Sequence, residues 1–482
     1  MTRLSLLSAS LLALATCGCS MAPPYAVPQM ELPASFREEP AWAEASPSDT
    51  QGKGAWWERF DDPVLTALEA QVLVSNQNLA SAAAAYQQAR ATVSENRSNL
   101  YPSVSLDASA SRTEAFGSTS GLPVNIDQLN SGDRFKIAPS ASWQPDVWGR
   151  IGDAVTQAGA QAEASLADLN NATLAAQGEL ASNYFRLRGV DATAALLNET
   201  VEAYTRTLEI TRNRYREGVA SRSDVAQAEV QLANARAQAR DTERQRATYE
   251  HAIAVLAGQN PSSFSLEPTD WRTPMPEVPS ILPSQLLERR PDIAAAERRV
   301  AAANAAIGVR KSAFFPTIGL TGSLSTSGSS VDQLFSAPNT FWSLGGSIAQ
   351  SLFDFGGNKA RLNQAKASYD QAVANYRQTV LSAFQDTEDG LAAMRVLKQV
   401  LAERASASES AGRAEAFALD RYLAGETDYT AVVTAQASAL QAGQSEIQSV
   451  TDRQIALISL FQAIGGDVQT QDAHLPRTQK AQ

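Results

Sequence analysis

The sequence predicts an α+β membrane protein whose chain is a tandem duplication. Three observations support this fold class: short segments recur in order in two halves, four segments alternate polar and apolar residues, and two long alanine-rich stretches lack proline. With 44% hydrophobic and 19% charged residues, the composition is that of a folded protein. The mean hydropathy of -0.23 excludes a helical protein with many membrane spans.

The chain begins with the pattern of an export signal over residues 1–18. Arg3 supplies a positive charge, and Leu4–Ala15 form an apolar stretch that is too short to span a bilayer. The mature protein is therefore expected to leave the cytoplasm.

Both cysteines, Cys17 and Cys19, stand at the end of this signal. One interpretation is a signal that is discarded after the small residues Ala13 and Ala15. The other is a lipoprotein signal with Cys19 as the acylated residue and Cys17 as a weaker alternative. Several acyl chains would attach the protein stably, because each buried methylene contributes about 0.8 kcal/mol. Ser20, which follows Cys19 in place of an Asp, is compatible with transport to an outer membrane.

The two halves of the chain share ordered sequence matches. The matched segments are Asn99–Pro102 with Ala313–Pro316, Asp146–Arg150 with Asp354–Asn358, Arg214–Gly218 with Arg421–Gly425, and Leu256–Gly258 with Ala463–Gly465. Composition alone is unlikely to produce such an ordered set, so the pattern indicates a duplication.

These matches divide the chain into repeats and connecting segments. The first repeat covers 62–258 and the second covers 292–466. The stretch 259–291 is rich in proline, which prevents helix and favours an extended connector. The segment 19–61 is expected to be extended, and 467–482 to be a flexible tail.

Each repeat is expected to contain a helix, a β-hairpin, a long helix, a turn and a last helix. The first helices are Asp62–Asn99 and Asp292–Ser312, which are rich in Ala, Gln, Glu and Arg. In the second repeat Pro291 and Asp292 favour a helix start, through the fixed φ of proline and the favourable interaction of an acid with the helix dipole.

The hairpins are predicted at 103–143 and 317–353. Their strands alternate apolar or small residues with Ser, Thr and Asp, and Gly, Ser, Pro and Asn separate the two strands of each pair. The predicted strands are Ser103–Arg112, Phe135–Trp143, Thr317–Ser325 and Phe341–Phe353.

The long helices are predicted at Arg150–Asn213 and Lys359–Asp420. Neither stretch contains proline, and at the usual helical rise each would reach about 90 Å. The last helices carry apolar residues at spacings of three, four and seven, which is typical of coiled-coil packing. Turns at 214–225 and 421–432 join each long helix to the helix that follows it.

Four strands of about ten residues have the length of membrane-crossing β-strands, but they cannot close a wall. A bilayer tolerates no open sheet edge, so other copies of the chain must complete the sheet. Two copies would give eight strands, and three would give twelve with a wider lumen. The residues allow both numbers, and conduction favours three. The alternative is a soluble β-subdomain on a helical stalk.

Three segments resemble the TolC-like outer-membrane factor family, in its lipoprotein branch often called NodT-type. They are Cys19-Ser-Met-Ala-Pro-Pro-Tyr-Ala-Val-Pro28, Trp56-Trp-Glu-Arg-Phe-Asp-Asp-Pro-Val-Leu65, and Leu282–Arg299 with its continuation to Pro316. The resemblance extends over nearly the whole chain from Cys19 to Gly466, and it favours Cys19 over Cys17 as the acylated residue.

The resemblance implies a homotrimer, anchored in outer-membrane lipid, with a twelve-stranded β-barrel that a long α-helical barrel continues through the periplasm. Such a channel conducts drugs, metals or other small molecules without chemical change. Its partners are a periplasmic adaptor protein and an inner-membrane pump, commonly of the resistance-nodulation-division type.

The resemblance also implies roles for the two turns. They would ring the periplasmic mouth and contact the adaptor through Arg214, Tyr215, Gly218, Arg421, Tyr422 and Gly425. A gate would involve Asp224, Tyr422 and Thr427. This sequence departs from the family pattern at three positions. Thr427 stands where Arg is common, and Ala431 and Thr434 replace acidic residues, so closure is expected to depend on Tyr422, Asp224 and packing. Simple helix-end packing is the alternative role for Tyr422 and Tyr215.

No enzymatic site, metal site or cofactor is expected. The two histidines, His251 and His474, have no neighbours at metal-ligand spacing, and no phosphate loop or nucleophile elbow occurs. The carboxylates Asp386, Glu388 and Asp389 are interpreted as a solvated or lumen-facing cluster.

The net charge of -11 without a Lys/Arg run argues against nucleic acid as a partner. A non-conducting periplasmic scaffold or adaptor lipoprotein is the alternative function, and the four membrane-length strands argue against it.

Overall fold

The computed structural model describes residues 20–30, 36–37, 55–113, 132–269, 276, 289–336 and 339–466. The expected signal peptide 1–18, both cysteines with the lipidation site Cys19, and the tail 467–482 lie outside the described residues, as does most of the connector 259–291.

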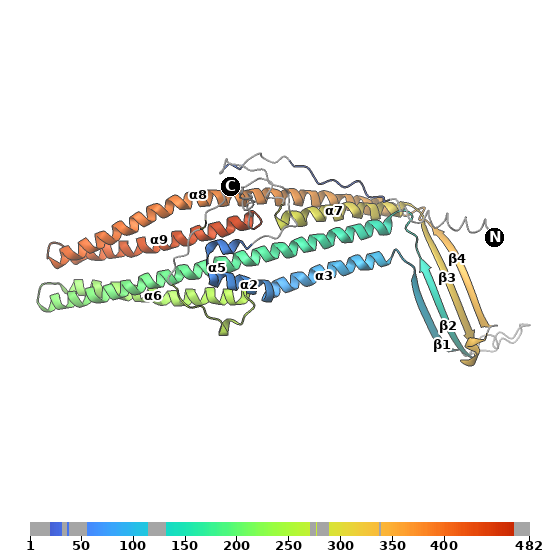
Figure 1. The fold of residues 1–482 in the computed structure, drawn as a ribbon, viewed down its shortest axis with the longest axis horizontal. Coiled ribbons are helices and arrows are strands. Elements are labelled where there is room, and N and C mark those ends of the chain that lie inside the picture. Colours follow the sequence, from blue (N-terminus) through green and yellow to red (C-terminus); the bar gives the residue numbers. More distant parts are fainter. Residues whose placement is uncertain are drawn as a thin grey trace, which may run out of the picture. The chain divides into compact units, whose positions relative to one another are not determined.

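The elements appear in the same order in the two halves of the chain (Figure 1). The described helices of more than one turn are α2 (Pro63–Ser75), α3 (Gln77–Ser98), α5 (Arg150–Arg216), α6 (Arg222–Leu256), α7 (Pro291–Lys311), α8 (Gly357–Leu423) and α9 (Tyr429–Ala463). The described strands are β1 (Ser103–Thr113), β2 (Gly132–Trp143), β3 (Thr317–Gly328) and β4 (Thr340–Ala349). Short 3₁₀ turns are η1 (Trp56–Phe60), η2 (Pro261–Ser263), η4 (Ser312–Phe314) and η5 (Asp332–Phe335). Helices α5 and α8 each contain 67 residues, and α6 and α9 each contain 35.

The chain forms two compact units. The first contains Ala85–Ser165 and Ala296–Tyr376, together with the described residues up to Gln29, and includes all four described strands. The second contains Leu166–Ala295 and Arg377–Gln482 within the described ranges, together with the described residues between Met30 and Ala84, and includes both helix hairpins. None of the described helices is both long enough and apolar enough to cross a membrane.

The strands of the first unit form one antiparallel sheet in the order β1-β2-β3-β4. Ser103 pairs with Ser142 in the first hairpin, and Thr317 pairs with Ala349 in the second. Pairing of β2 with β3 joins the hairpins, and it is interrupted around Pro139, which has no N–H to donate.

Strand β4 is shorter than the expected Phe341–Phe353. Its last residue, Ala349, pairs with Thr317, which is the first residue of β3. The residue before Thr317 is Pro316, so the neighbouring strand cannot extend the ladder past this point.

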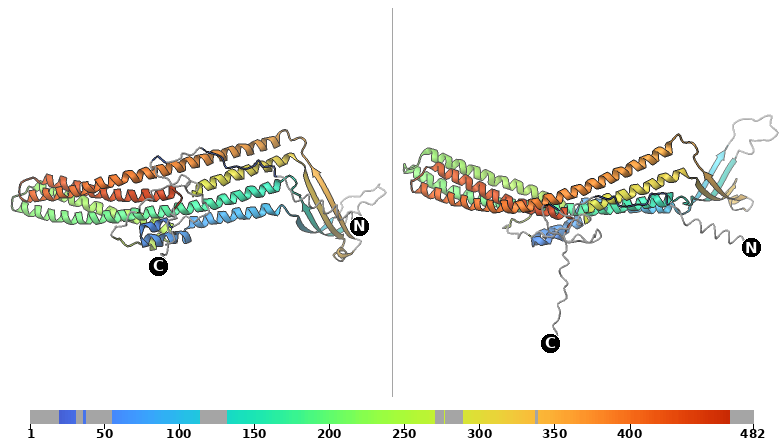
Figure 2. Two further views of the ribbon diagram at one scale, coloured as in Figure 1. Left: turned by 45° about the horizontal axis from the view of Figure 1, so that its top comes forward. Right: turned by 90° about the horizontal axis from the view of Figure 1, so that it is seen from above.

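The helices of the second unit form two hairpins, α5 with α6 and α8 with α9. Figure 2 shows the two helices of each hairpin side by side in both further views. A buried cluster fills the space near the helix turns, and its members are Tyr204, Leu208, Ala228, Leu232, Ala235, Tyr422, Tyr429 and Val432.

Aromatic side chains form another part of this unit's core. Trp56 stacks on Phe461 with ring centroids 5.6 Å apart, and Phe60 lies 4.8 Å from Phe185. The hydroxyl of Tyr184 donates to Asp62 at 2.6 Å, while Asp62 also caps the start of α2. The tryptophan-rich entry to the first repeat is thereby fixed against both α5 and α9.

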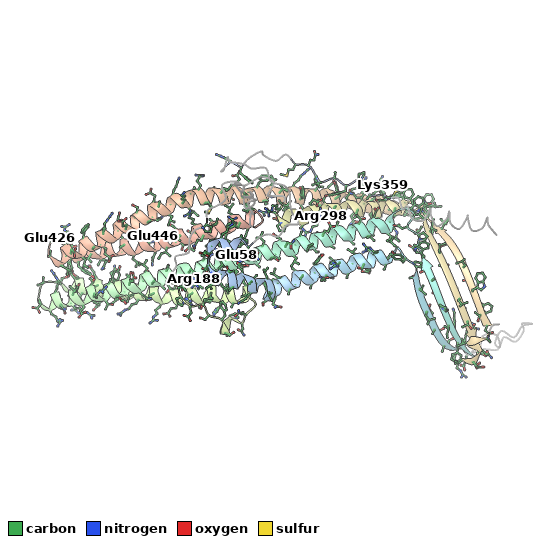
Figure 3. All side chains as sticks on the ribbon, viewed as in Figure 1. Glu58, Arg188, Arg298, Lys359, Glu426 and Glu446 are labelled. Carbon is green, nitrogen blue, oxygen red and sulfur yellow. The ribbon has the colours of Figure 1, made fainter. Side chains whose placement is uncertain are left out.

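A buried ion network secures the start of the connector. Arg188, labelled in Figure 3, pairs with Asp191 at 3.0 Å and donates to the carbonyl of Glu267 at 2.9 Å. Arg246 pairs with Asp191 at 2.8 Å and with Glu250 at 2.7 Å. The charges compensate one another, as buried charges require.

The expected first helix 62–99 is interrupted. Asn76 separates α2 from α3, with its backbone in the extended region. Its side-chain oxygen accepts from the N–H groups of Asn78 and Leu79 at 2.9 and 3.1 Å, and its amide donates to the carbonyl of Leu256 at 2.8 Å. Asn76 therefore caps a second helix and binds the end of α6 at once.

Candidate channel wall and helix-hairpin turns

One face of the four-stranded sheet is lined by hydroxyl groups. By strand register this hydroxyl face consists of Ser103, Ser105, Ser109, Ser111, Ser140, Ser142, Thr321, Ser323, Ser325, Ser327, Ser343 and Ser347. Asp107, Arg134 and Lys136 lie on it as well. Asp107 is negative, whereas Arg134 and Lys136 are positive, so this face is hydrophilic and carries charges of both signs.

A serine row, Ser105, Ser140, Ser323 and Ser343, crosses all four strands of the hydroxyl face. The hydroxyls of Ser105 and Ser140 lie 2.9 Å apart, as do those of Ser323 and Ser343. These hydroxyls are paired with one another within each hairpin, and the side chains are uncharged.

The opposite, apolar face is largely exposed. Its members are Val104, Leu106, Ile137, Ala141, Ile318, Leu320, Leu324, Trp342, Leu344 and Ile348. Leu344 is 81% exposed and Trp342 is 79% exposed. A contiguous apolar surface of this kind marks an interaction site, and alternation with a polar face is the pattern of a strand between lipid and a wet lumen.

The two outer strands leave the sheet open. Among the described strands, β1 pairs with β2 alone and β4 pairs with β3 alone. One side of each outer strand therefore presents N–H and C=O groups that no described strand pairs.

Aromatic residues gather where the strands end. Trp143 donates its indole N–H to the carbonyl of Leu100 at 3.0 Å, and Trp148 donates to the carbonyl of Pro316 at 2.7 Å. Phe353 and Phe355 are almost completely exposed. Amphipathic and aromatic rings at this position are typical of a membrane interface. This aromatic group was not predicted from the sequence, although the aromatic residues next to the predicted strand ends are a visible signal.

The turns between the long and last helices have the same backbone structure. In the first, Val219 N–H donates to the Arg214 carbonyl at 2.8 Å, and Gly218, with φ of 76°, donates to the Tyr215 carbonyl. In the second, Glu426 N–H donates to the Arg421 carbonyl at 2.9 Å, and Gly425 has φ of 79°. Both are Schellman caps, whose left-handed position favours glycine.

The following helices begin with side-chain caps. Ser221 and Asp224 form a reciprocal capping box at the start of α6, and Asp428 accepts from the N–H of Ala431 at the start of α9. The turns themselves therefore occupy only 217–221 and 424–428, which is narrower than the expected 214–225 and 421–432.

The chain is similar to known proteins over almost its full length. A family model described as outer membrane efflux protein matches residues 68–259 and 282–466. The chain is 30% identical to the probable efflux pump outer membrane protein TtgC of Pseudomonas putida, over 96% of this chain and 95% of the relative. It is 30% identical to outer membrane protein OprJ of Pseudomonas aeruginosa, over 95% of each. The chain belongs to the outer membrane efflux protein family.

The solved structure of the outer-membrane channel OprN matches this efflux protein with a TM-score of 0.83 and 29% identity, over 93% of this chain and 99% of that chain. Family membership confirms the predicted function in efflux at the outer membrane.

Tyr422 of this efflux protein is buried between the two helix hairpins. Its ring lies 5.2 Å from that of Tyr429, and the guanidinium of Arg214 lies over it at 4.9 Å from the centroid. Arg214 also donates to the Leu423 carbonyl at 2.8 Å. Burial raises the pKa of Tyr429 to about 12, and the nearby Tyr422 and Asp224 add to this rise. Within one copy, Tyr422 thus serves in helix-end packing, the alternative role considered above.

Among the described residues, no hydrogen bond joins the Tyr422 hydroxyl to the other expected gate residues, Asp224 and Thr427. Asp224 accepts from the backbone N–H of Ser221 at 3.0 Å and from its hydroxyl at 2.8 Å, so it is engaged in capping α6. Thr427 is half-buried in its turn, and Thr434 donates to the carbonyl of Thr430. The gate itself stays a prediction.

The carboxylates Asp386, Glu388 and Asp389 are not simply solvated. Asp386 pairs with Arg290 at 3.1 Å, and Glu388 accepts from the backbone N–H of Arg37 at 2.7 Å. Among the described residues, no group of three or more His, Cys, Asp or Glu side chains could hold a metal ion.

Proposed function

We propose that three copies of this efflux protein form one outer-membrane channel, in which twelve strands make a β-barrel that an α-helical barrel continues in the periplasm. Substrates would pass passively to the exterior. The observation that carries this proposal is the sheet, with a hydroxyl face, an exposed apolar face and two open edges.

The open edges support assembly from several copies. In a bilayer each unpaired N–H or C=O costs several kcal/mol, so β4 of one copy would pair with β1 of the next. Eight strands from two copies would leave an interior that side chains nearly fill. Twelve strands from three copies would leave room for solutes.

The apolar face and the hydroxyl face of the sheet indicate which side of the proposed barrel wall would meet lipid and which would meet the lumen. The apolar face, with exposed Leu344 and Trp342, would meet lipid, and the hydroxyl face would line the lumen. Because the serine row is uncharged, it would pass solutes of diverse chemistry and leave their selection to a pump.

The helix turns support contact with other proteins. We assign Tyr215, Gly218, Arg421 and Gly425, which are exposed, to adaptor contacts. Arg214 and Tyr422 would act inside each copy and hold the turns in place for the adaptor. Asp224 and Thr427 would contribute to closure between neighbouring copies, and Tyr422 would support closure by holding the turns in place.

The proposed partners supply energy and attachment. TtgC is a component of an efflux pump, and by analogy an inner-membrane pump of the resistance-nodulation-division type would drive transport through this channel. The acylated Cys19 would attach each copy to outer-membrane lipid.

Reconstitution tests the channel. The purified full-length protein should migrate as a heat-modifiable oligomer and give single-channel conductance in planar bilayers. Ser140→Lys, in the serine row, should shift ion selectivity toward anions, whereas Ser140→Thr should leave it unchanged because it keeps the hydroxyl. A stable monomer without conductance would overturn the proposal and favour the non-conducting scaffold.

A further inference from the structure

The segment that follows the expected acylation site is bound by a buried carboxylate. Both oxygens of Asp153, on α5, are occupied: Ser20 donates its hydroxyl to one at 2.5 Å, and the N–H of Met21 donates to the other at 3.2 Å. The Ser20 hydroxyl also accepts from the N–H of Ala22 at 3.2 Å. Asp153 is only 4% exposed, so these bonds form in a partly desolvated site.

One face of α7 continues this contact along the segment. Asn304 donates its amide to the carbonyl of Pro23 at 2.8 Å, and Glu297 accepts from the hydroxyl of Tyr25. Both α7 side chains are buried. Arg298, labelled in Figure 3, pairs with Glu297 and, at 2.9 Å, with Glu163 of α5. The segment therefore runs antiparallel to α7 and is held at several successive positions.

Gly308 leaves space for the bound segment. A Cβ at this position would lie 2.1 Å from the Asp153 carboxylate oxygen and 2.6 Å from the backbone nitrogen of Ala22. Residues 297, 304 and 308 lie on the same side of α7, because seven and four residues are near-integral numbers of helical turns. This side of α7 thus provides a hydrogen-bond donor at Asn304, an acceptor at Glu297 and space at Gly308 for one extended peptide.

We propose that Asp153, Asn304, Gly308 and Glu297 form a clamp for Ser20–Tyr25 that fixes the lipid anchor to the first unit. This clamp rests on the proposed acylation of Cys19. Its role is to keep the tether between the acyl chains and the folded unit as short as the chain allows.

Tether length decides how strongly the anchor aids assembly. With Cys19 acylated, one residue step of roughly 4 Å separates the anchor from the clamped Ser20, and with Cys17 the reach would be roughly 11 Å. A short, fixed tether raises the effective concentration of the sheet at the membrane surface. A short tether also limits the orientations of the sheet before assembly. Less orientational freedom is then lost when the open strand edges of two copies join.

A matched pair of glycine substitutions tests the clamp in the full-length, acylated protein. Gly308→Ala should displace the segment and speed hydrogen exchange at Met21 and Ala22 about tenfold. Gly159→Ala is the control, because a Cβ at Gly159 meets no heavy atom of the described residues within 4 Å. Asp153→Asn provides a second displacement that does not add volume, and helical circular dichroism verifies that all variants fold. Exchange at wild-type rates in both Gly308→Ala and Asp153→Asn would overturn the clamp.

A matched pair of insertions tests its role. Ser-Gly-Ser-Gly-Ser-Gly placed between Cys19 and Ser20 lengthens the tether by about 14 Å and keeps a serine after the cysteine. The same insertion between Ala26 and Val27 lies beyond the clamp. With palmitate labelling equal in all forms, the first should lower the heat-modifiable oligomer fraction about threefold, and the second should not.

The outcomes separate this inference from the channel proposal. If the wild-type protein forms no oligomer, the proposed channel fails. If wild type assembles and both insertions assemble equally well, the anchoring role of the clamp is wrong while the channel stands. Mass spectrometry that finds Cys17 as the acylated residue would also overturn the inference.

Discussion

Arg214 links the ends of the two helix hairpins through one side chain. Its guanidinium covers the Tyr422 ring and donates to the Leu423 carbonyl, although it belongs to the end of α5. A cation over a partly buried ring and a charged hydrogen bond each stabilise by about 1 to 2 kcal/mol. One residue thus makes two polar contacts between the hairpin ends.

Replacing this arginine should loosen the hairpin ends. We expect Arg214→Ala to lower the stability of the helical unit by about 2 kcal/mol and to raise the resting conductance of the reconstituted channel, while Arg214→Lys keeps the charge and loses less. Denaturant unfolding and planar-bilayer recording check this.

The control is Arg240→Ala. Arg240 pairs with Glu243 at 2.6 Å, but both side chains are exposed, so its removal should change stability by less than about 0.5 kcal/mol. Equal effects of the two alanine variants would contradict the role of Arg214.

Glu69 is a buried acid in α2. It has no exposed surface, and neither of its carboxylate oxygens has a hydrogen-bond partner among the described residues. Burial raises its pKa from 4.5 to about 9, so the side chain is protonated at neutral pH.

This shift predicts a pH-dependent stability. Below pH 4.5 both folded and unfolded forms hold the proton, so Glu69 has no effect on the pH dependence there. Between pH 4.5 and 9 only the unfolded form ionises, so stability falls as pH rises. Glu69→Gln should therefore stabilise the detergent-solubilised protein by roughly 3 kcal/mol at pH 7 and not at pH 4. Thermal unfolding at the two pH values measures this, with the exposed Glu58→Gln as control. Equal gains at both pH values would show that Glu69 is ionised when folded.

At the scale of the elements, Asn76 divides what the composition presents as one helix. Asn76→Ala removes both the cap of α3 and the bond to the Leu256 carbonyl, and we expect a loss of about 2 kcal/mol. The exposed Asn78→Ala should cost little. Denaturant unfolding of both variants checks this, and a loss below about 0.5 kcal/mol for Asn76→Ala would show that the break has another cause.

Local sequence patterns were sufficient to predict most helices and strands. They failed where a group distant in the sequence determines where an element ends. The alternation of polar and apolar residues placed each strand start within three residues of its observed position. This signal is local, because it can be read from adjacent residues in the sequence. The break at Asn76 depends on a carbonyl 180 positions away in the chain, which periodicity cannot reveal. The end of β4 likewise depends on where β3 begins.

The candidate site shows the same limit. The Gly218 and Gly425 motifs located both turns, since a Schellman cap is a local structure. The burial of Tyr422 depends on Arg214, which reaches the Leu423 carbonyl across 209 positions of sequence. A repeat pattern alone offered Tyr422 and Tyr215 as equivalents, yet Tyr422 is 4% exposed and Tyr215 is 46% exposed.

At the scale of the whole molecule, the geometry of the open edges constrains how copies would join in the proposed channel. The sheet of one chain has a hydroxyl face and an apolar face, and closure must keep every strand's hydroxyl face on the same side. That condition is met when β4 of one copy pairs with β1 of the next in a ring. Such head-to-tail contacts close only at the copy number that the sheet's curvature permits.

Disulfide trapping across the open edges counts the copies. Ser105→Cys on β1 is combined in turn with a cysteine at Phe341, Ser343, Gly345 or Ser347 of β4, because all these positions share the hydroxyl face. Strand pairing brings only facing residues within disulfide reach, so we expect one combination to cross-link efficiently and its neighbours weakly. Electrophoresis without reductant should then show bands of one, two and three chains and none larger. A series ending at two chains would support eight strands, and an absence of cross-links at every combination would contradict pairing between β1 and β4.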